Sequence, residues 1–198
     1  MSDTYKDARA TVLELAGEAF KDHVLTPEGE DRWTCRRPGK SAYWFRIVRA
    51  PGTLILLGDV GTAVFECYGP DSFAVLTSAD WHYLLSKMTA LSRNAGQKEK
   101  FYAGDALAYA REAASESPES KNWRALVNEV AQLDKWGDFN EHEWHKAIEA
   151  YGLDVDDHSA GRNYSEGALW AVEAVRCFAR LIKNQPEAKL AIATENER

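Results

Sequence analysis

The sequence predicts an α+β fold, with an N-terminal helix and a four-stranded antiparallel meander followed by a mostly α-helical C-terminal half. Apolar residues recur at helical spacing over 4–20, alternate with polar residues over 32–68, and return to helical spacing after Ser78. Apolar residues make up 45% of the 198 residues and charged residues 28%, a composition typical of globular proteins.

The first helix is expected over 4–20, where apolar residues lie three and four positions apart and Asp3 or Thr4 is available as an N-cap. Its end is marked by the turn residues of 26–29, which include Pro27 and Gly29. The N-terminal helix is therefore separated from the strands by a break in the chain.

Four strands are expected within 32–68, joined by glycine-containing turns at 37–40, 50–52 and 58–61. Three short connections between consecutive strands predict an antiparallel meander. The strand at 53–57 is apolar at both alternating positions, so we expect both of its faces to be covered.

The remaining chain has helical periodicity. Five helices are expected, over 78–91, 105–114, 120–133, 140–151 and 163–183. The change of periodicity divides the chain into a helix-plus-sheet region, 1–76, and an acidic helical region, 77–198. The two regions could also form one compact domain.

Cysteine content and hydropathy exclude several classes of protein. Cys35, Cys67 and Cys177 are odd in number and widely spaced, which argues against a disulfide framework and against a cysteine-rich zinc site. The longest apolar run, 54–57, is far shorter than the ~20 residues of a membrane helix. With no secretory signal at the N-terminus, we expect a cytoplasmic protein without a cofactor.

Charge is distributed unevenly along the chain. Residues 1–100 contain 13 basic and 13 acidic side chains, whereas residues 101–198 contain 11 and 18, a net charge of −7. The whole net charge of the protein therefore lies in the helical half. This distribution argues against nucleic-acid binding by that half and favours a partner with a basic surface.

Several spaced motifs lie within residues 20–76: DHVLT at 22–26, RPGKSAYWF at 37–45, PG at 51–52 and GDVGTAVF at 58–65. This region resembles a family of small proteins of unknown function that are encoded by bacteriophages and prophages. The resemblance implies a phage product that acts in the bacterial host cell. It supplies no catalytic residues.

One candidate site combines basic and aromatic residues of the strands: Arg32, Arg36, Trp44 and Arg46. Guanidinium groups beside an aromatic face can bind a nucleotide or single-stranded nucleic acid through phosphate contacts and base stacking. The alternative is structural, with arginine stems that cover aromatic rings and pair with acids of the helical half.

A second candidate is a partner-binding surface made of acidic residues of the helical half: Asp138, Glu141, Glu143, Glu149, Asp154, Asp156 and Asp157. Residues 154–165 match a calcium loop poorly, because Ser159 and Ser165 replace the glycine and the glutamate that such a loop requires. A solvated acidic surface is the simpler interpretation.

His142 and His145 are weak candidates for metal ligands, because two histidines three residues apart on a helix can share an ion. Pairing of His145 with Glu141 and Glu149, four residues away on either side, explains the same pattern without a metal. We therefore predict no metal site.

Three functions are compatible with these features. The favoured one is a phage-encoded accessory protein that binds and inhibits or modulates a host factor through its acidic helices, for example in an anti-defence or anti-CRISPR role. The second is a protein or enzyme that binds a nucleotide or single-stranded nucleic acid on its basic-aromatic sheet. The third is a structural phage component. Enzymatic activity is left open, although no catalytic motif favours it.

Overall fold

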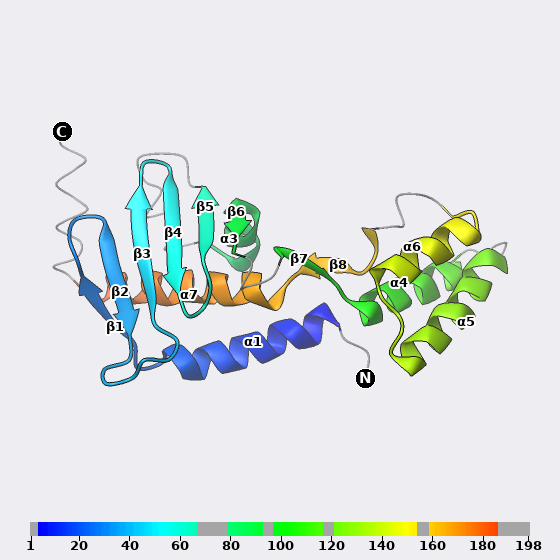
Figure 1. Cartoon of the computed structure of the whole chain (residues 1–198), viewed down its shortest axis with the longest axis horizontal. Coiled ribbons are helices and arrows are strands. Elements are labelled where there is room, and N and C mark those ends of the chain that lie inside the picture. The colour runs from blue at the N-terminus through cyan, green and yellow to red at the C-terminus, as the bar shows by residue number, and fades with distance from the viewer. Residues whose placement is uncertain (1–3, 67–78, 93–96, 117–120, 154–158, 186–198) are drawn as a thin grey trace. The chain divides into compact units, whose positions relative to one another are not determined.

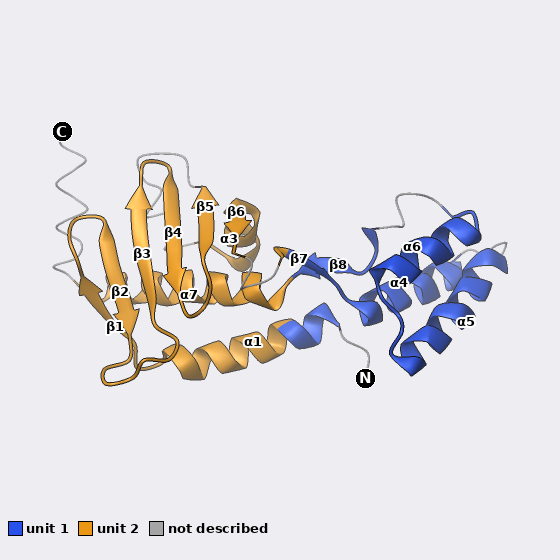
Figure 2. Ribbon diagram, viewed as in Figure 1, with its two compact units in different colours: residues 1–8, 99–164 blue, residues 9–98, 165–198 orange. Residues whose placement is uncertain are grey.

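The computed structural model describes residues 4–66, 79–92, 97–116, 121–153 and 159–185 (Figure 1). It confirms the α+β class, with an N-terminal helix, an antiparallel sheet and a helical C-terminal half. The chain forms two compact units (Figure 2). Unit 1 comprises residues 1–8 and 99–164, and unit 2 comprises residues 9–98 and 165–198.

Unit 2 contains a six-stranded sheet in which every neighbouring pair of strands is antiparallel and the spatial order follows the chain. Its strands are β1 (Val24–Pro27), β2 (Arg32–Arg36), β3 (Phe45–Ala50), β4 (Thr53–Gly58), β5 (Ala63–Glu66) and β6 (Met88–Leu91). The predicted four-stranded meander corresponds to β2–β5. The two edge strands, β1 and β6, were not predicted.

One face of this sheet, the inner face, forms the core of unit 2 against two helices (Figure 1). These helices are α1 (Tyr5–Phe20) and α7 (Glu166–Lys183). The ring of Phe20 in α1 lies 5.5 Å from that of Phe45, and Phe178 of α7 lies 5.4 Å from Trp33. Most apolar strand residues that point inward are almost fully buried, as period-two alternation requires.

The opposite, outer face of the sheet is less covered than the sequence predicts. In β4 the inward Leu54 and Leu56 are buried, but the outward Ile55 and Leu57 remain partly exposed. A continuous apolar run therefore does not mean that β4 is buried on both faces. The outer face is open at least in part, and the candidate site lies on it.

The predicted helix over 78–91 is shorter in the structure. Helix α3 (Trp81–Lys87) is capped by Asp80, whose carboxylate accepts a hydrogen bond of 2.8 Å from the backbone N–H of Tyr83. The chain then becomes extended at Met88 and pairs with β5 as β6. The apolar spacing of Met88 and Leu91 suits a helix, but edge pairing with β5 overrides it. Ser78 lies outside the described residues.

The described residues of unit 1 include the first residues of α1, the three helices α4 (Ala103–Glu116), α5 (Lys121–Trp136) and α6 (Glu141–Ala150), and a small two-stranded sheet. This sheet pairs β7 (Glu99–Phe101) with β8 (Arg162–Tyr164) in antiparallel orientation. The hydrophobic core of unit 1 includes Leu126, Trp144 and Ile148. The predicted start of the last helix near residue 163 is too early, because 162–164 form β8 and Ser165 caps α7 through the N–H of Ala168.

The units are bounded differently from the regions expected at 1–76 and 77–198. Helices α3 and α7 pack with the sheet, so the chain leaves unit 2 after Lys98 and returns to it at Ser165. These two residues are linked by a hydrogen bond of 2.9 Å from the Ser165 N–H to the Lys98 carbonyl. Residues 99–164 thus form an insertion between two adjacent points of unit 2.

Candidate functional site

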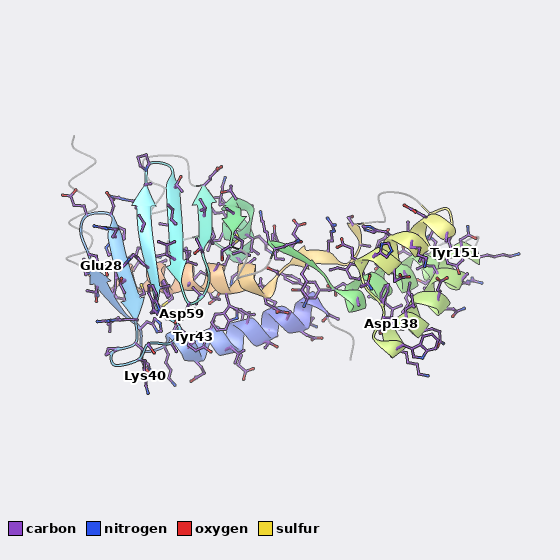
Figure 3. All side chains as sticks on the ribbon, in the orientation of Figure 1. Glu28, Lys40, Tyr43, Asp59, Asp138 and Tyr151 are labelled. Carbon is purple, nitrogen blue, oxygen red and sulfur yellow. The ribbon has the colours of Figure 1, made fainter. Side chains whose placement is uncertain are left out.

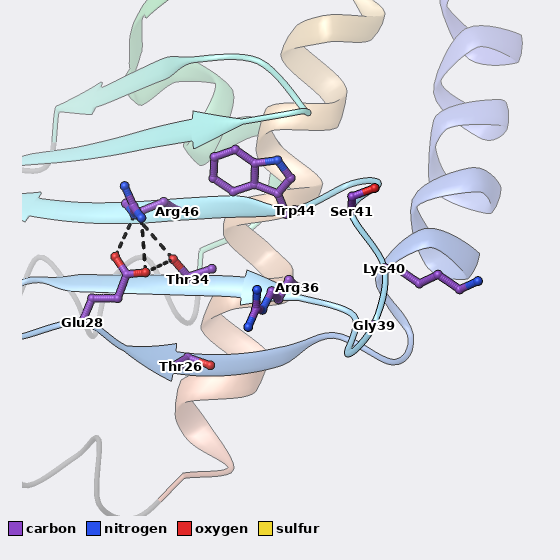
Figure 4. A pocket seen from close by; sticks show the side chains of 9 residues that line it. All are labelled: Thr26, Glu28, Thr34, Arg36, Gly39, Lys40, Ser41, Trp44 and Arg46. Carbon is purple, nitrogen blue, oxygen red and sulfur yellow. Dashed lines mark hydrogen bonds and ion pairs between the residues drawn. The ribbon is translucent and has the colours of Figure 1, made fainter.

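An open depression of about 780 Å³ lies on the outer face of the sheet, at the end formed by β1, β2 and the start of β3 (Figure 4). Its lining consists of Thr26, Glu28, Thr34, Arg36, Gly39, Lys40, Ser41, Trp44 and Arg46. Three of the four residues predicted to bind an anionic ligand, Arg36, Trp44 and Arg46, are among them. Arg32 lies on the same face of β2 without lining the depression.

Strand register explains why these residues meet. Thr34 lies directly opposite Arg46 in the β2–β3 pair. Arg36 is two residues further along β2, so it lies diagonally across from Arg46, a spacing of roughly 7–8 Å that long side chains can bridge. Trp44 precedes β3 and points to the same outer face as Arg46, as Figure 4 shows.

The loop between β2 and β3 positions Trp44. Gly39 and Tyr43 have positive φ values of 71° and 60°, which turn the chain back toward the sheet. The Tyr43 carbonyl accepts a hydrogen bond of 2.9 Å from Nε2 of the buried His23. This bond anchors the loop immediately before Trp44.

Arg46 is held by a carboxylate inside the depression. Its Nε lies 2.9 Å from Oε2 of Glu28, and its Nη2 donates a 3.2 Å hydrogen bond to Oε1. The Thr34 hydroxyl donates a hydrogen bond of 2.6 Å to the same Oε1. The bond from Thr34, followed by the contacts with Arg46, lowers the pKa of Glu28 below the usual value.

Arg36 differs from Arg46. The guanidinium of Arg36 is exposed and forms no hydrogen bond or ion pair within the described part of the chain. The same is true of Lys40, whose side chain extends away from Trp44 and Arg46 (Figure 4). Arg36 is therefore the cation of the depression that is most available to a ligand.

Other arginines of the sheet pair within their own unit. Arg37 binds Asp22, and Nε of Arg49 lies 2.6 Å from Oδ1 of Asp31. Arg46, which was expected to pair with acids of the helical half, pairs instead with Glu28, so that expectation is wrong for it. The acidic partners of these three arginines lie in the turn after α1 and in the β1–β2 turn, segments that the sequence pattern did not place beside the sheet.

Glu28 and Thr34 are the important residues of the depression that sequence reasoning missed. Alternation along 32–36 places Thr34 on the same face as Arg32 and Arg36, so that signal was present. Glu28 had no comparable signal, because it follows an edge strand that was interpreted as a break in the chain.

The predicted acidic surface is partly neutralised. Glu141 pairs with Arg162, and a carboxylate oxygen of Glu143 lies 3.5 Å from Nζ of Lys146. Within the described residues, the side chains of Asp138 and Glu149 are exposed and form no hydrogen bond or ion pair. Asp138 is labelled in Figure 3. Asp154, Asp156 and Asp157 lie outside the described residues.

The two candidate histidines do not form a metal site with other described residues. His145 Nε2 lies 4.0 Å from Oε1 of Glu141, the surface pairing that was considered as the alternative. His142 is exposed on the same helix, α6. Among the residues that the structure describes, no three His, Cys, Asp or Glu side chains are grouped so as to hold a metal ion.

A second depression, of about 740 Å³, lies elsewhere on unit 2. Its lining includes Asp59 and Tyr43, both labelled in Figure 3, and Trp170. The rings of Tyr43 and Trp170 stack with their centroids 5.6 Å apart. Asp59 occupies a turn that is closed by the hydrogen bond from the Gly61 N–H to the Gly58 carbonyl. A role in the turn accounts for this aspartate.

Comparison of the chain with protein-family models, with curated proteins and with solved structures found no match. Within the described residues, no helix is long and apolar enough to cross a membrane.

Proposed function

We propose that unit 2 binds a small ligand that carries both a phosphate group and an aromatic ring, a nucleotide being the simplest ligand of this kind. The observation that carries the proposal is the convergence of Arg36, Arg46 and Trp44 on one open depression. The volume of this depression, about 780 Å³, lies within the range of small-molecule sites in proteins.

The chemistry of the three side chains suits the two parts of such a ligand. A guanidinium group offers paired N–H donors that match phosphate oxygens, and Arg36 is free to supply them. The indole of Trp44 offers an apolar face for stacking of a base. Arg36 stands on β2 and Trp44 directly before the adjacent strand β3, so the fold holds both groups in place before a ligand arrives.

A titration with adenosine 5′-monophosphate (AMP), followed by tryptophan fluorescence, tests this function. We expect saturable quenching, and we expect Arg36→Gln to weaken binding by about tenfold, the effect of one charge-assisted hydrogen bond. Trp44→Ala should abolish binding while circular dichroism shows a preserved fold; because this variant lacks the indole that reports quenching, its binding is measured by calorimetry.

Arg124→Gln is the matched control, because it removes an exposed arginine of α5 in unit 1. It should leave AMP affinity unchanged. Absence of binding by the unmodified protein to AMP and to the other nucleoside monophosphates would contradict the proposed function.

A second proposal concerns unit 1, which contains 8 basic and 16 acidic side chains and so carries a net charge of −8, whereas unit 2 carries +1. This asymmetry favours docking of unit 1 on a basic partner through exposed acids such as Asp138 and Glu149. Capture of a partner from host lysate should weaken with added salt and in the Asp138→Asn/Glu149→Gln variant. Salt-insensitive capture would argue against this docking surface.

The biological context of either activity rests on the sequence resemblance alone. A phage-encoded inhibitor or modulator of a bacterial host factor, including an anti-CRISPR protein, would use the acidic surface of unit 1. A nucleotide-binding protein or enzyme would use the depression of unit 2. The latter is the function that the geometry favours.

A further inference from the structure

The carboxylate of Glu28 is a negatively charged group of the protein that lies inside the depression. Both carboxylate oxygens of Glu28 contact Arg46, and Oε1 also accepts the hydrogen bond from Thr34. Arg46 therefore has its guanidinium directed at Glu28 in the ligand-free protein, whereas Arg36 has no such partner among the described residues. The two arginines of the site therefore differ in how readily a ligand can contact them.

The contact between Glu28 and Arg46 affects how a phosphate-bearing ligand would bind in the depression. An incoming phosphate can contact Arg36 at once, but it reaches the Nε and Nη2 donors of Arg46 that Glu28 contacts only by displacing that carboxylate. A phosphodiester carries a single negative charge, as Glu28 does, so the exchange gains little. A phosphate monoester carries a charge of about −1.5 to −2 at pH 7 and three terminal oxygens, enough to contact both arginines.

On the basis of the proposed function, we infer that Glu28 is a built-in competitor for the anionic group of the ligand, and that the site takes phosphate monoesters that can displace it. The diagonal placement of Arg36 and Arg46 on β2 and β3 allows one phosphate to lie between their side chains. Glu28 then acts as the specificity-determining residue of the depression.

Calorimetric titrations of the full chain with AMP and with adenosine 3′,5′-cyclic monophosphate, a phosphodiester with the same base, test this inference. The unmodified protein should bind AMP at least about fivefold more tightly than the cyclic nucleotide. Glu28→Gln keeps the size of the side chain but removes its charge, so it should raise AMP affinity by about fivefold, the upper range for release of a partly exposed ion pair.

Glu30→Gln is the matched control. Glu30 is exposed in the same β1–β2 connection and has no hydrogen bond or ion pair within the described residues. If removal of any nearby negative charge were sufficient, both variants would gain equally. The inference requires that Glu30→Gln changes AMP affinity by less than about twofold.

The Nε–H resonance of Arg46 in a ¹⁵N-correlated spectrum supplies an independent readout. AMP should shift this resonance in the unmodified protein, because the guanidinium exchanges Glu28 for phosphate. Glu28→Gln should shift it without ligand. A resonance that responds to AMP no more than that of Arg49, which pairs with Asp31 outside the depression, would overturn the displacement.

Failure of this inference and failure of the proposed function have different outcomes. If neither the unmodified protein nor Glu28→Gln binds AMP, the proposed function is wrong. If the unmodified protein binds AMP but Glu28→Gln binds it equally or less tightly, Glu28 is no competitor, and the proposed function stands. Equal affinity of the unmodified protein for the two nucleotides would overturn the preference for phosphate monoesters.

Discussion

At the residue scale, Arg36 and Arg46 are identical side chains on one face of the sheet, but they differ in whether an acidic side chain of the protein contacts them. Arg46 lies beside Glu28 at 2.9 Å, whereas Arg36 extends from β2 without a partner in the described chain. The difference arises from the β1–β2 turn, which places Glu28 next to Thr34 and Arg46. The ligand binding proposed for this site would therefore depend on one acid as well as on the basic residues.

Glu28 should give stability a pH dependence. Its pKa is lowered by Thr34 and Arg46, so its ionised form is favoured in the folded state. The resulting stabilisation is present above the pKa of glutamate in the unfolded chain, ~4.3, and is lost as the pH falls through the lower folded value. We expect the unmodified protein to exceed Glu28→Gln modestly in urea midpoint at pH 7, with the difference shrinking as the pH falls below ~4.3. A difference that does not shrink at acid pH would contradict this.

The buried thiols of Cys35 and Cys177 do not line the depression. Burial raises the pKa of Cys35 and Cys177, and both lie in the core of unit 2. They behave as small apolar side chains, as their positions in apolar segments predict. Cys67 lies outside the described residues.

At the element scale, the turn between β4 and β5 depends on Gly58. Its φ is +142°, and an added Cβ would lie 2.5 Å from the Trp44 carbonyl oxygen and 2.8 Å from Cα of Phe45. Gly29 has nearly the same φ, +140°, but open space around the added atom. Gly58→Ala should therefore cost about 1–3 kcal/mol more in unfolding free energy than Gly29→Ala. Equal losses in chemical denaturation would show that the close approach is unimportant.

The elements that could be predicted from the sequence are those with a long regular pattern. Alternation identified β2–β5, and apolar spacing identified the helices of unit 1. The missed strands are short, since β1 and β6 have four residues each and β7 and β8 have three. Pairing with a neighbouring strand, rather than their own periodicity, determines that they are extended.

The candidate site, like the fold, could be predicted only in part from the sequence. Alternation along the chain placed Arg36 with Arg32 on one face of their strand, and Trp44 with Arg46 on one side of the next. The register that brings Arg36 together with Trp44 and Arg46 comes from the structure. Glu28 meets Arg46 because β1 pairs with β2 and β2 pairs with β3, and the short strand β1 was not predicted from the sequence. The residue proposed to control the site was thus the one that the local sequence pattern did not reveal.

At the scale of the whole molecule, the net charge is divided in the same way as the chain is divided into compact units. The inserted residues 99–164, together with residues 1–8, form a unit with a net charge of −8, and the sheet unit is nearly neutral at +1. The division of charge follows the compact units more closely than a division at residue 76 or 100. This separation favours two binding activities located in different units.

Replacement of residues 99–164 by a two-glycine linker tests this separation. Lys98 and Ser165 are already joined by a backbone hydrogen bond of 2.9 Å, so the linker need span little distance. We expect the shortened chain to fold and to bind AMP within about threefold of the full protein, an affinity change of less than one hydrogen bond. Loss of AMP binding from a folded shortened chain would contradict the autonomy of unit 2, and so would failure to fold.

The central claim is that the outer-face depression of unit 2 binds a phosphate-bearing ligand. Backbone amide shifts in a ¹⁵N-correlated spectrum, recorded during titration of the full chain with AMP, test it most directly. We predict saturable shifts concentrated at residues 26–46, together with a shift of the Trp44 indole N–H. Saturable shifts confined to the second depression around Asp59 or to unit 1, or the absence of any saturable shift, would contradict the claim.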